Sequence, residues 1–130
     1  MRRVPKTDED CVNAMAVLRR VAEFVRTHEC GRGGDYDVSD DPVKCKNISL
    51  GYKDRWKLMT DVAKAIDGKW DVSEGLDVME IRTKSGDDTL VKVNTNTCGV
   101  CVSVNESLLR DETCGREASE LWESILPPVP

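Results

Sequence analysis

The residues of this sequence with the clearest chemical potential are Cys98 and Cys101, which form its single C-x-x-C motif. Thiolates bind soft metal ions and exchange with disulfides, and a close pair can serve either reaction. His28 and Cys30 lie together in an earlier part of the chain and could supply two further ligands. These four residues predict a candidate site that is either a tetrahedral zinc site or a redox-active thiol pair.

The spacing of the four residues weakens both interpretations. Only Glu29 separates His28 from Cys30, whereas paired ligands in structural zinc sites usually have about two to four residues between them. A thioredoxin-like pair lies at the start of a helix, whose dipole lowers the thiol pKa, but strand-like alternation follows Cys101. Free cysteines are often buried in reducing compartments, so we expect most of the six cysteines to be structural, with Cys45 and Cys114 as reserve ligands.

The apolar residues around the C-x-x-C motif change phase. They lie at odd positions before the motif and at even positions within and after it: Val91, Val93, Val100, Val102 and Val104. Because side chains alternate between the two faces of a strand, a turn or bulge must interrupt residues 94–99. Asn and Gly in this segment tolerate the backbone angles of a turn. We therefore expect Cys98 at the tip of a loop and Cys101 on the face opposite the later valines.

The spacing of apolar residues along the sequence predicts the helices and strands that position these residues. Apolar residues recur every three or four positions over residues 7–29 and 53–66, which predicts two helices. The period becomes two over residues 70–72, 77–83, 89–94 and 100–104, which predicts short strands. Between the two helices, residues 30–51 have no periodicity and are rich in Gly and Asp, which predicts a long acidic loop.

A further helix is expected to begin between Ser107 and Thr113 and to end at Leu126, before two prolines. The order of elements predicts a single α+β domain over residues 1–130. Its two layers comprise two N-terminal helices, a small antiparallel β-meander of three to four strands, and a C-terminal helix. Trp56 and Trp122 fall on apolar helix faces, so we expect both in the core, whereas the pattern does not assign Trp70.

Composition limits the classes of partner. The formal net charge is −5, which argues against nucleic acid, because binding to phosphates requires a clustered basic surface. With 39% hydrophobic and 33% charged residues, the composition is typical of soluble globular proteins. No apolar run is long enough for a membrane span, and no apolar segment follows the basic start as in a secretory signal. We therefore expect a cytoplasmic protein without membrane association.

The sequence contains no G-x-S-x-G, P-loop or dinucleotide-binding motif, and a single histidine gives weak support for catalysis. An acidic surface, the exposed edge of a short sheet and a long loop favour binding to another protein. The leading interpretation is a non-catalytic protein-binding or adaptor module without a cofactor. The alternative is a zinc-binding or thiol-redox protein that uses His28, Cys30, Cys98 and Cys101.

Overall fold

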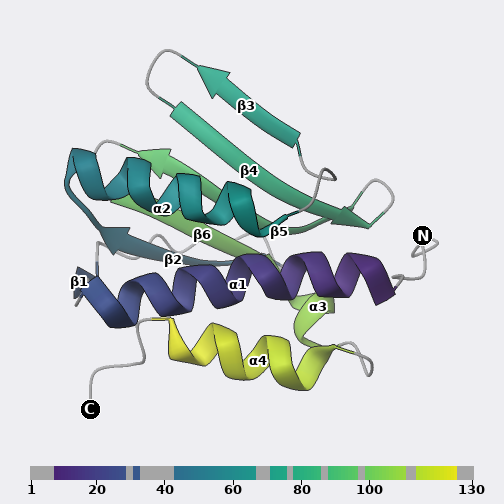
Figure 1. The fold of residues 1–130 in the computed structure, drawn as a ribbon. Coiled ribbons are helices and arrows are strands. Elements are labelled where there is room, and N and C mark those ends of the chain that lie inside the picture. The colour runs from purple at the N-terminus through teal and green to yellow at the C-terminus, as the bar shows by residue number, and fades with distance from the viewer. Residues whose placement is uncertain are drawn as a thin grey trace.

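The computed structural model describes residues 8–28, 31–32, 43–66, 71–75, 78–85, 88–96, 99–110 and 114–125. They form an α+β domain with an antiparallel sheet of six strands in the order β1-β2-β6-β5-β4-β3 (Figure 1). The strands are β1 Gly31–Arg32, β2 Val43–Ser49, β3 Asp71–Gly75, β4 Val78–Ser85, β5 Asp88–Asn96 and β6 Gly99–Asn105. The helices are α1 Asp8–His28, α2 Tyr52–Ala65, α3 Glu106–Leu109 and α4 Gly115–Ser124.

The three longer helices lie side by side on one face of the sheet, with α1 between α2 and α4 (Figure 1). Their apolar stripes and the inward valines of the sheet enclose one continuous core, which includes Leu18, Met59, Ile81, Val102 and Trp122. This two-layer arrangement confirms the predicted α+β fold, with β3 to β6 as the predicted meander. No helix in the described ranges is long and apolar enough to cross a membrane.

The predicted change of valine phase is confirmed by the pairing of β5 with β6. Val91 pairs with Val104 and Val93 pairs with Val102, so residues of opposite parity lie opposite each other. All of these valines are buried on the helix side of the sheet. The last pair is Asn96 with Gly99, and the connection between them, which includes Cys98, lies outside the described residues.

The expected loop over residues 30–51 is wrong for residues 31–32, which form the short strand β1, and for residues 43–49, which form strand β2. This strand pairs with β6 along its whole length, from Val43 with Asn105 to Ser49 with Gly99. The sequence gives no strand period here because two of the three positions facing the helices are lysines, Lys44 and Lys46. Tertiary pairing therefore creates this strand, whereas the acidic residues 33–42 lie outside the described part of the chain.

The inward Lys46 is accommodated at the end of α4. Its Nζ donates hydrogen bonds to the carbonyl oxygens of Trp122, at 2.5 Å, and Ile125, at 2.7 Å. The same ammonium lies 4.5 Å from the centroid of the Trp122 ring, within the range of a cation–π interaction. A cation at a helix C-terminus satisfies carbonyls that have no partner within the helix and interacts favourably with the helix dipole. Lys46 therefore joins β2 to α4.

The expected C-terminal helix is divided into α3 and α4. A short turn of helix follows β6 directly, and the main helix begins at Gly115. A Cβ atom at Gly115 would lie 2.8 Å from the Leu109 carbonyl oxygen, so the two helices approach more closely than a side chain allows. The absence of a side chain at this position permits the chain to turn back onto α1.

Gly99→Ala should destabilise the protein by about 1–3 kcal/mol, the usual cost of a forced overlap in a packed site. A Cβ atom at Gly99 would lie only 1.9 Å from the Ile48 carbonyl oxygen, so β2 and β6 would have to separate at this pair. Urea unfolding measures the loss. Gly51→Ala is the control, since no atom lies within 4 Å of the added Cβ. Equal effects of the two substitutions would contradict the assigned register.

Lys46→Met should lower the unfolding free energy by about 1–3 kcal/mol, because it removes two charged hydrogen bonds; the Trp122 carbonyl keeps the Ile125 N–H, whereas the Ile125 carbonyl loses its lysine donor. Lys44→Met on the same side of the same strand is the matched control. Lys44 is 53% exposed and lies 3.3 Å from Glu106, so its loss should cost about 1 kcal/mol or less. Thermal unfolding followed by circular dichroism compares the two; a larger effect at Lys44 would exclude the bridging role of Lys46.

Candidate functional site

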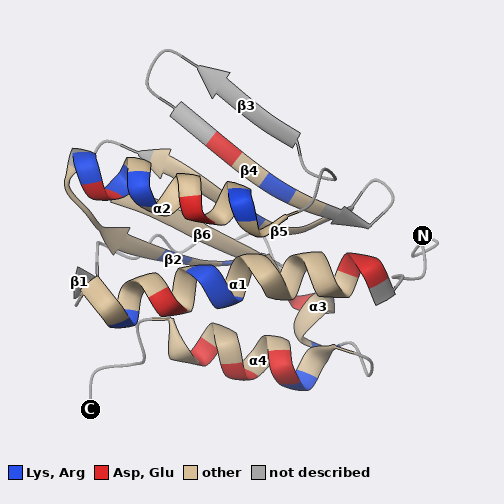
Figure 2. Cartoon of the chain, viewed as in Figure 1, with Lys and Arg blue, Asp and Glu red and all other residues tan. Residues whose placement is uncertain are grey.

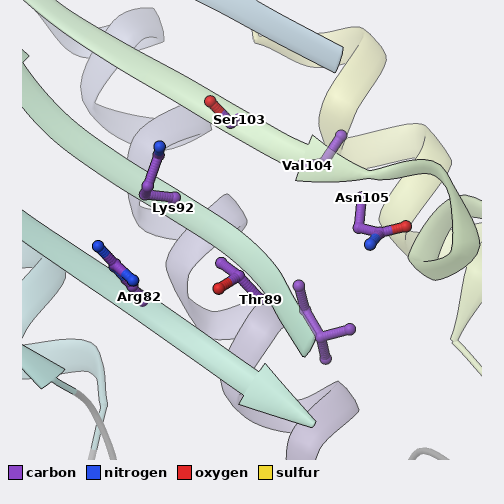
Figure 3. Close-up of a pocket in the computed structure, with 7 residues that line it drawn as sticks. Arg82, Thr89, Lys92, Ser103, Val104 and Asn105 are labelled. Carbon is purple, nitrogen blue, oxygen red and sulfur yellow. The ribbon is translucent and has the colours of Figure 1, made fainter. Parts of the chain in front are cut away.

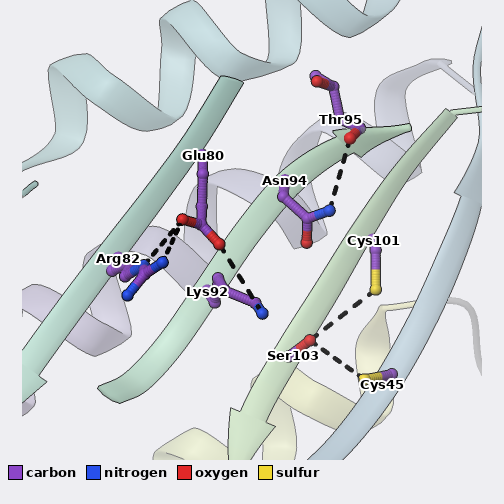
Figure 4. A network of polar contacts seen from close by, with 8 residues as sticks. All are labelled: Cys45, Glu80, Arg82, Lys92, Asn94, Thr95, Cys101 and Ser103. Carbon is purple, nitrogen blue, oxygen red and sulfur yellow. Dashed lines mark hydrogen bonds and ion pairs between the residues drawn. The ribbon is translucent and has the colours of Figure 1, made fainter. Parts of the chain in front are cut away.

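The face of the sheet opposite the helices is polar. Because side chains alternate along a strand, the residues between the buried valines point to this face, which we call the open face because no described helix covers it, although Asn47 and Ser103 on it are only 6% exposed. On the four central strands they include Asn47 and, as Figure 4 shows, Cys45, Glu80, Arg82, Lys92, Asn94, Cys101 and Ser103. Antiparallel sheets commonly have one face packed on the core and one face in water. The chemistry-bearing side chains of the described sheet are concentrated on this face.

An ion cluster lies on β4 and β5. Arg82 donates from Nε and Nη2 to the same Glu80 oxygen at 2.9 and 2.5 Å. The Lys92 Nζ lies 3.8 Å from the other Glu80 oxygen (Figure 4). Arg82 and Lys92 are 40% and 39% exposed, so we assign these pairs about 1 kcal/mol or less each. One carboxylate shared by two cations leaves this part of the face with a net positive charge.

A second cluster contains two thiols on either side of one hydroxyl group. Cys45 pairs with Ser103 across β2 and β6, and Cys101 precedes Ser103 by two residues on the same face. The Ser103 Oγ lies 3.1 Å from the Cys45 Sγ and 3.8 Å from the Cys101 Sγ (Figure 4). Both cysteines are free and partly buried. The strand register therefore brings together two sulfurs that lie 56 residues apart in the chain.

The surroundings of Cys101 favour its protonated form. Burial is the largest cause that raises the pKa of its thiol, and the neighbouring Cys45 raises the pKa further. The Ser103 hydroxyl and the charge of Lys92 act in the opposite direction and do not reverse the shift. The reactive species in thiol chemistry is the thiolate, so Cys101 is a weak nucleophile at neutral pH.

A small pocket of about 160 Å³ opens beside the ion cluster. Its lining includes Arg82, Thr89, Leu90, Lys92, Ser103, Val104 and Asn105 (Figure 3). The register of β4 and β5 shifts between Thr83 and Lys84. This bulge lies opposite the start of β5, where Thr89 and Leu90 line the pocket. Binding sites for drug-sized molecules usually occupy about 300–1,000 Å³, so this pocket matches a small ion or a few waters.

The structure describes two of the four predicted site residues, His28 and Cys101. Cys30 and Cys98 lie outside the described residues. His28 is exposed at the end of α1, where its ring stacks on Phe24 at 3.9 Å and its Nδ1 lies 2.9 Å from the Thr27 hydroxyl. Cys101 lies on the open face with Cys45. Among the described residues, no group of three or more His, Cys, Asp or Glu side chains is arranged to hold a metal, and the four-residue site stays a prediction.

Sequence reasoning treated Cys45 only as a reserve ligand and missed its proximity to Cys101. The lysines on either side of Cys45 conceal the alternation that would have assigned the segment to a strand. The Val43-Lys-Cys-Lys-Asn-Ile-Ser49 sequence does contain β-branched residues near both ends, a weak signal for a strand. The other reserve ligand, Cys114, is buried in the core.

The expectation that Trp56 lies in the core is wrong, whereas Trp122 is buried as predicted. Trp56 is on α2 and remains 48% exposed. The buried side of α2 is formed by Leu58, Met59, Val62 and Ile66, and Trp56 lies at the margin of that side. A helical period of 3.6 residues does not separate the middle of an apolar stripe from its margin, which explains the error. Trp70 lies outside the described residues.

The outward face of α2, defined by Lys53, Trp56, Lys57, Thr60 and Lys64, is basic. All five side chains are exposed. Figure 2 shows α2 with several blue bands of basic residues and fewer red bands of acidic residues. The lysines follow one another along the helix, and Trp56 lies on one flank, one turn before Thr60. Asp54 and Asp61 lie on the same helix and partly offset the charge of the three lysines. This face differs in sign from the protein as a whole, whose net charge is −5.

Comparisons with known proteins give no relative. No protein-family model matches the sequence, no curated protein matches it, and no solved structure matches the fold.

Cys101→Ser should change the unfolding free energy by less than about 1 kcal/mol, because the position is partly exposed and a hydroxyl can bond there to Ser103 or water. Cys11→Ser is the comparison: Cys11 is 5% exposed in the core, and burial of a hydroxyl should cost about 1–3 kcal/mol. Urea unfolding of both variants in reducing buffer measures the difference. A loss at Cys101 that equals or exceeds the loss at Cys11 would contradict the open-face assignment.

Proposed function

We propose that the protein is a non-catalytic protein-binding module that docks its partners on the outward face of α2. The observation that carries the proposal is the exposed Trp56 beside Lys53, Lys57 and Lys64. Tryptophan is enriched among the residues that contribute most to protein interfaces, since it buries a large area and orders few torsions. The partner is expected to present an acidic segment with an apolar side chain that covers the indole ring.

Charge supports this choice of partner. The three lysines outnumber the two carboxylates on the same helix, Asp54 and Asp61, and the resulting local positive potential steers an acidic partner and disfavours a basic one. The long lysine side chains can also place their apolar stems against a bound segment while their ammonium groups remain in water. Because the rest of the chain is acidic overall, a polyanion such as nucleic acid would be repelled beyond this narrow face.

Two features of the open sheet face favour a binding role over a catalytic one. The raised pKa of Cys101 keeps its thiol protonated, and thus disfavours covalent catalysis by the most accessible sulfur pair in the described sheet. The pocket near Arg82 and Lys92 has a volume of about 160 Å³, which is small for an organic substrate.

The proposal is tested by capture of partners from native extract on the immobilised protein, with identification by mass spectrometry and measurement of affinity with the purified partner. Trp56→Ala should weaken binding at least about tenfold, equivalent to about 1.4 kcal/mol. The double variant Lys57→Glu, Lys64→Glu should weaken binding further at low salt and reduce its salt dependence. Thermal unfolding checks that each variant is folded.

Val12→Ala is the matched control, because Val12 is the other large hydrophobic side chain described as exposed, at 65%, and lies on α1. It should leave binding unchanged. Partners that bind Trp56→Ala and the charge-reversed variant as tightly as the original protein would refute the α2 surface. Capture that is lost after nuclease treatment would show a nucleic-acid partner and would refute the protein-binding assignment.

A further inference from the structure

The two sulfurs on the open face of the sheet occupy diagonal positions on neighbouring strands. Cys45 is opposite Ser103, whereas Asn47 is opposite Cys101, so the cysteines differ by one two-residue step in register. Both sulfurs nevertheless lie near the same Ser103 oxygen, at 3.1 and 3.8 Å. The pairing of β2 with β6 fixes the positions of the two cysteines in the folded sheet.

The diagonal register fits a bridging ion better than a disulfide. Diagonal neighbours on antiparallel strands have Cβ atoms about 7 Å apart, whereas a disulfide requires about 3.5–4.5 Å. A metal ion between two sulfurs extends the reach, since each metal–thiolate bond is about 2.3 Å long for zinc and similar for neighbouring ions. The backbone of β2 and β6 can therefore keep its pairing with an ion between the sulfurs.

We propose that Cys45 and Cys101 form a two-coordinate binding site for one Cu(I) ion. Each thiol releases a proton, and each sulfur donates one electron pair to the copper ion, whose oxidation state does not change. The product is a bis-thiolate with one net negative charge. The proposed ligand set includes no residue of the α2 docking surface and none of the predicted ligands His28, Cys30 and Cys98.

The nearby residues can stabilise the bound form. Ser103, between the two sulfurs, can donate its hydroxyl proton to one thiolate. Lys92 is directly opposite Ser103 on β5 and places a positive charge beside the bis-thiolate. Lys92 of the ion cluster would therefore offset the negative charge of the bis-thiolate.

Two soft thiolate ligands favour Cu(I) over other metal ions. Thiolates favour Cu(I) over hard divalent ions, and Cu(I) accepts two sulfur ligands. A structural zinc site requires four ligands, and the described residues contain no group of three or more candidate ligands. Zinc should therefore bind this pair weakly.

The test titrates the reduced, metal-free protein with the Cu(I)–bicinchoninate complex under anaerobic conditions and follows loss of the colour of the complex. One equivalent of copper should transfer to the protein. Cys45→Ser and Cys101→Ser should each lower the affinity by more than about 100-fold, beyond the effect of an outer-shell change. Cys30→Ser and Cys98→Ser are matched controls that should retain the original affinity, and zinc sulfate should not displace the copper.

X-ray absorption of the copper-loaded original protein gives a second measurement that does not depend on folded variants. A first shell of two sulfur atoms is expected. Three or more ligands, full binding by Cys45→Ser or Cys101→Ser, or loss of binding in Cys98→Ser would each overturn the site. Loss of binding in Ser103→Ala, without loss of Cu(I) in either cysteine variant, would also exclude a bis-thiolate.

Discussion

The pairing of β2 with β6 is the constraint on which the rest of the structure depends. It inserts a lysine-rich strand between β6 and the short β1, and thereby directs Lys46 to the end of α4. The same register places Cys45 beside Ser103 and brings the backbone of Ile48 against Gly99. Helix docking, the thiol pair and the close approach of the two strands therefore follow from a single alignment.

The two faces of the sheet have separate roles because strand side chains alternate. The inner face is mostly apolar and packs on α1 and α2, whereas the outer face collects carboxylate, guanidinium, ammonium, thiol and hydroxyl groups. On β2 the inner face carries two charged residues, Lys44 and Lys46, and Lys46 reaches the carbonyls at the end of α4. A charged residue is tolerated at that position because its hydrogen bonds are made by the fold itself.

The proposed binding surface and the proposed copper site lie on different elements and depend on different interactions. The face of α2 combines an exposed indole with three lysines that outnumber the aspartates of the same helix, so partner binding there depends on salt and on the area available to a partner. The Cys45 and Cys101 pair depends on a fixed strand register and on partial burial. Loss of one function by substitution should therefore leave the other intact.

Much of the fold was determined by local sequence pattern. Helical periods defined α1 and α2, and the switch of valine parity around residues 94–99 predicted the β5–β6 hairpin, because period and phase are properties of adjacent residues. Pairing between distant segments decided the rest. Strand β2, the neighbour of Cys101 and the exposure of Trp56 depend on where a segment lies relative to others, and contacts such as Lys46 with α4 or Cys45 with Ser103 leave no local period.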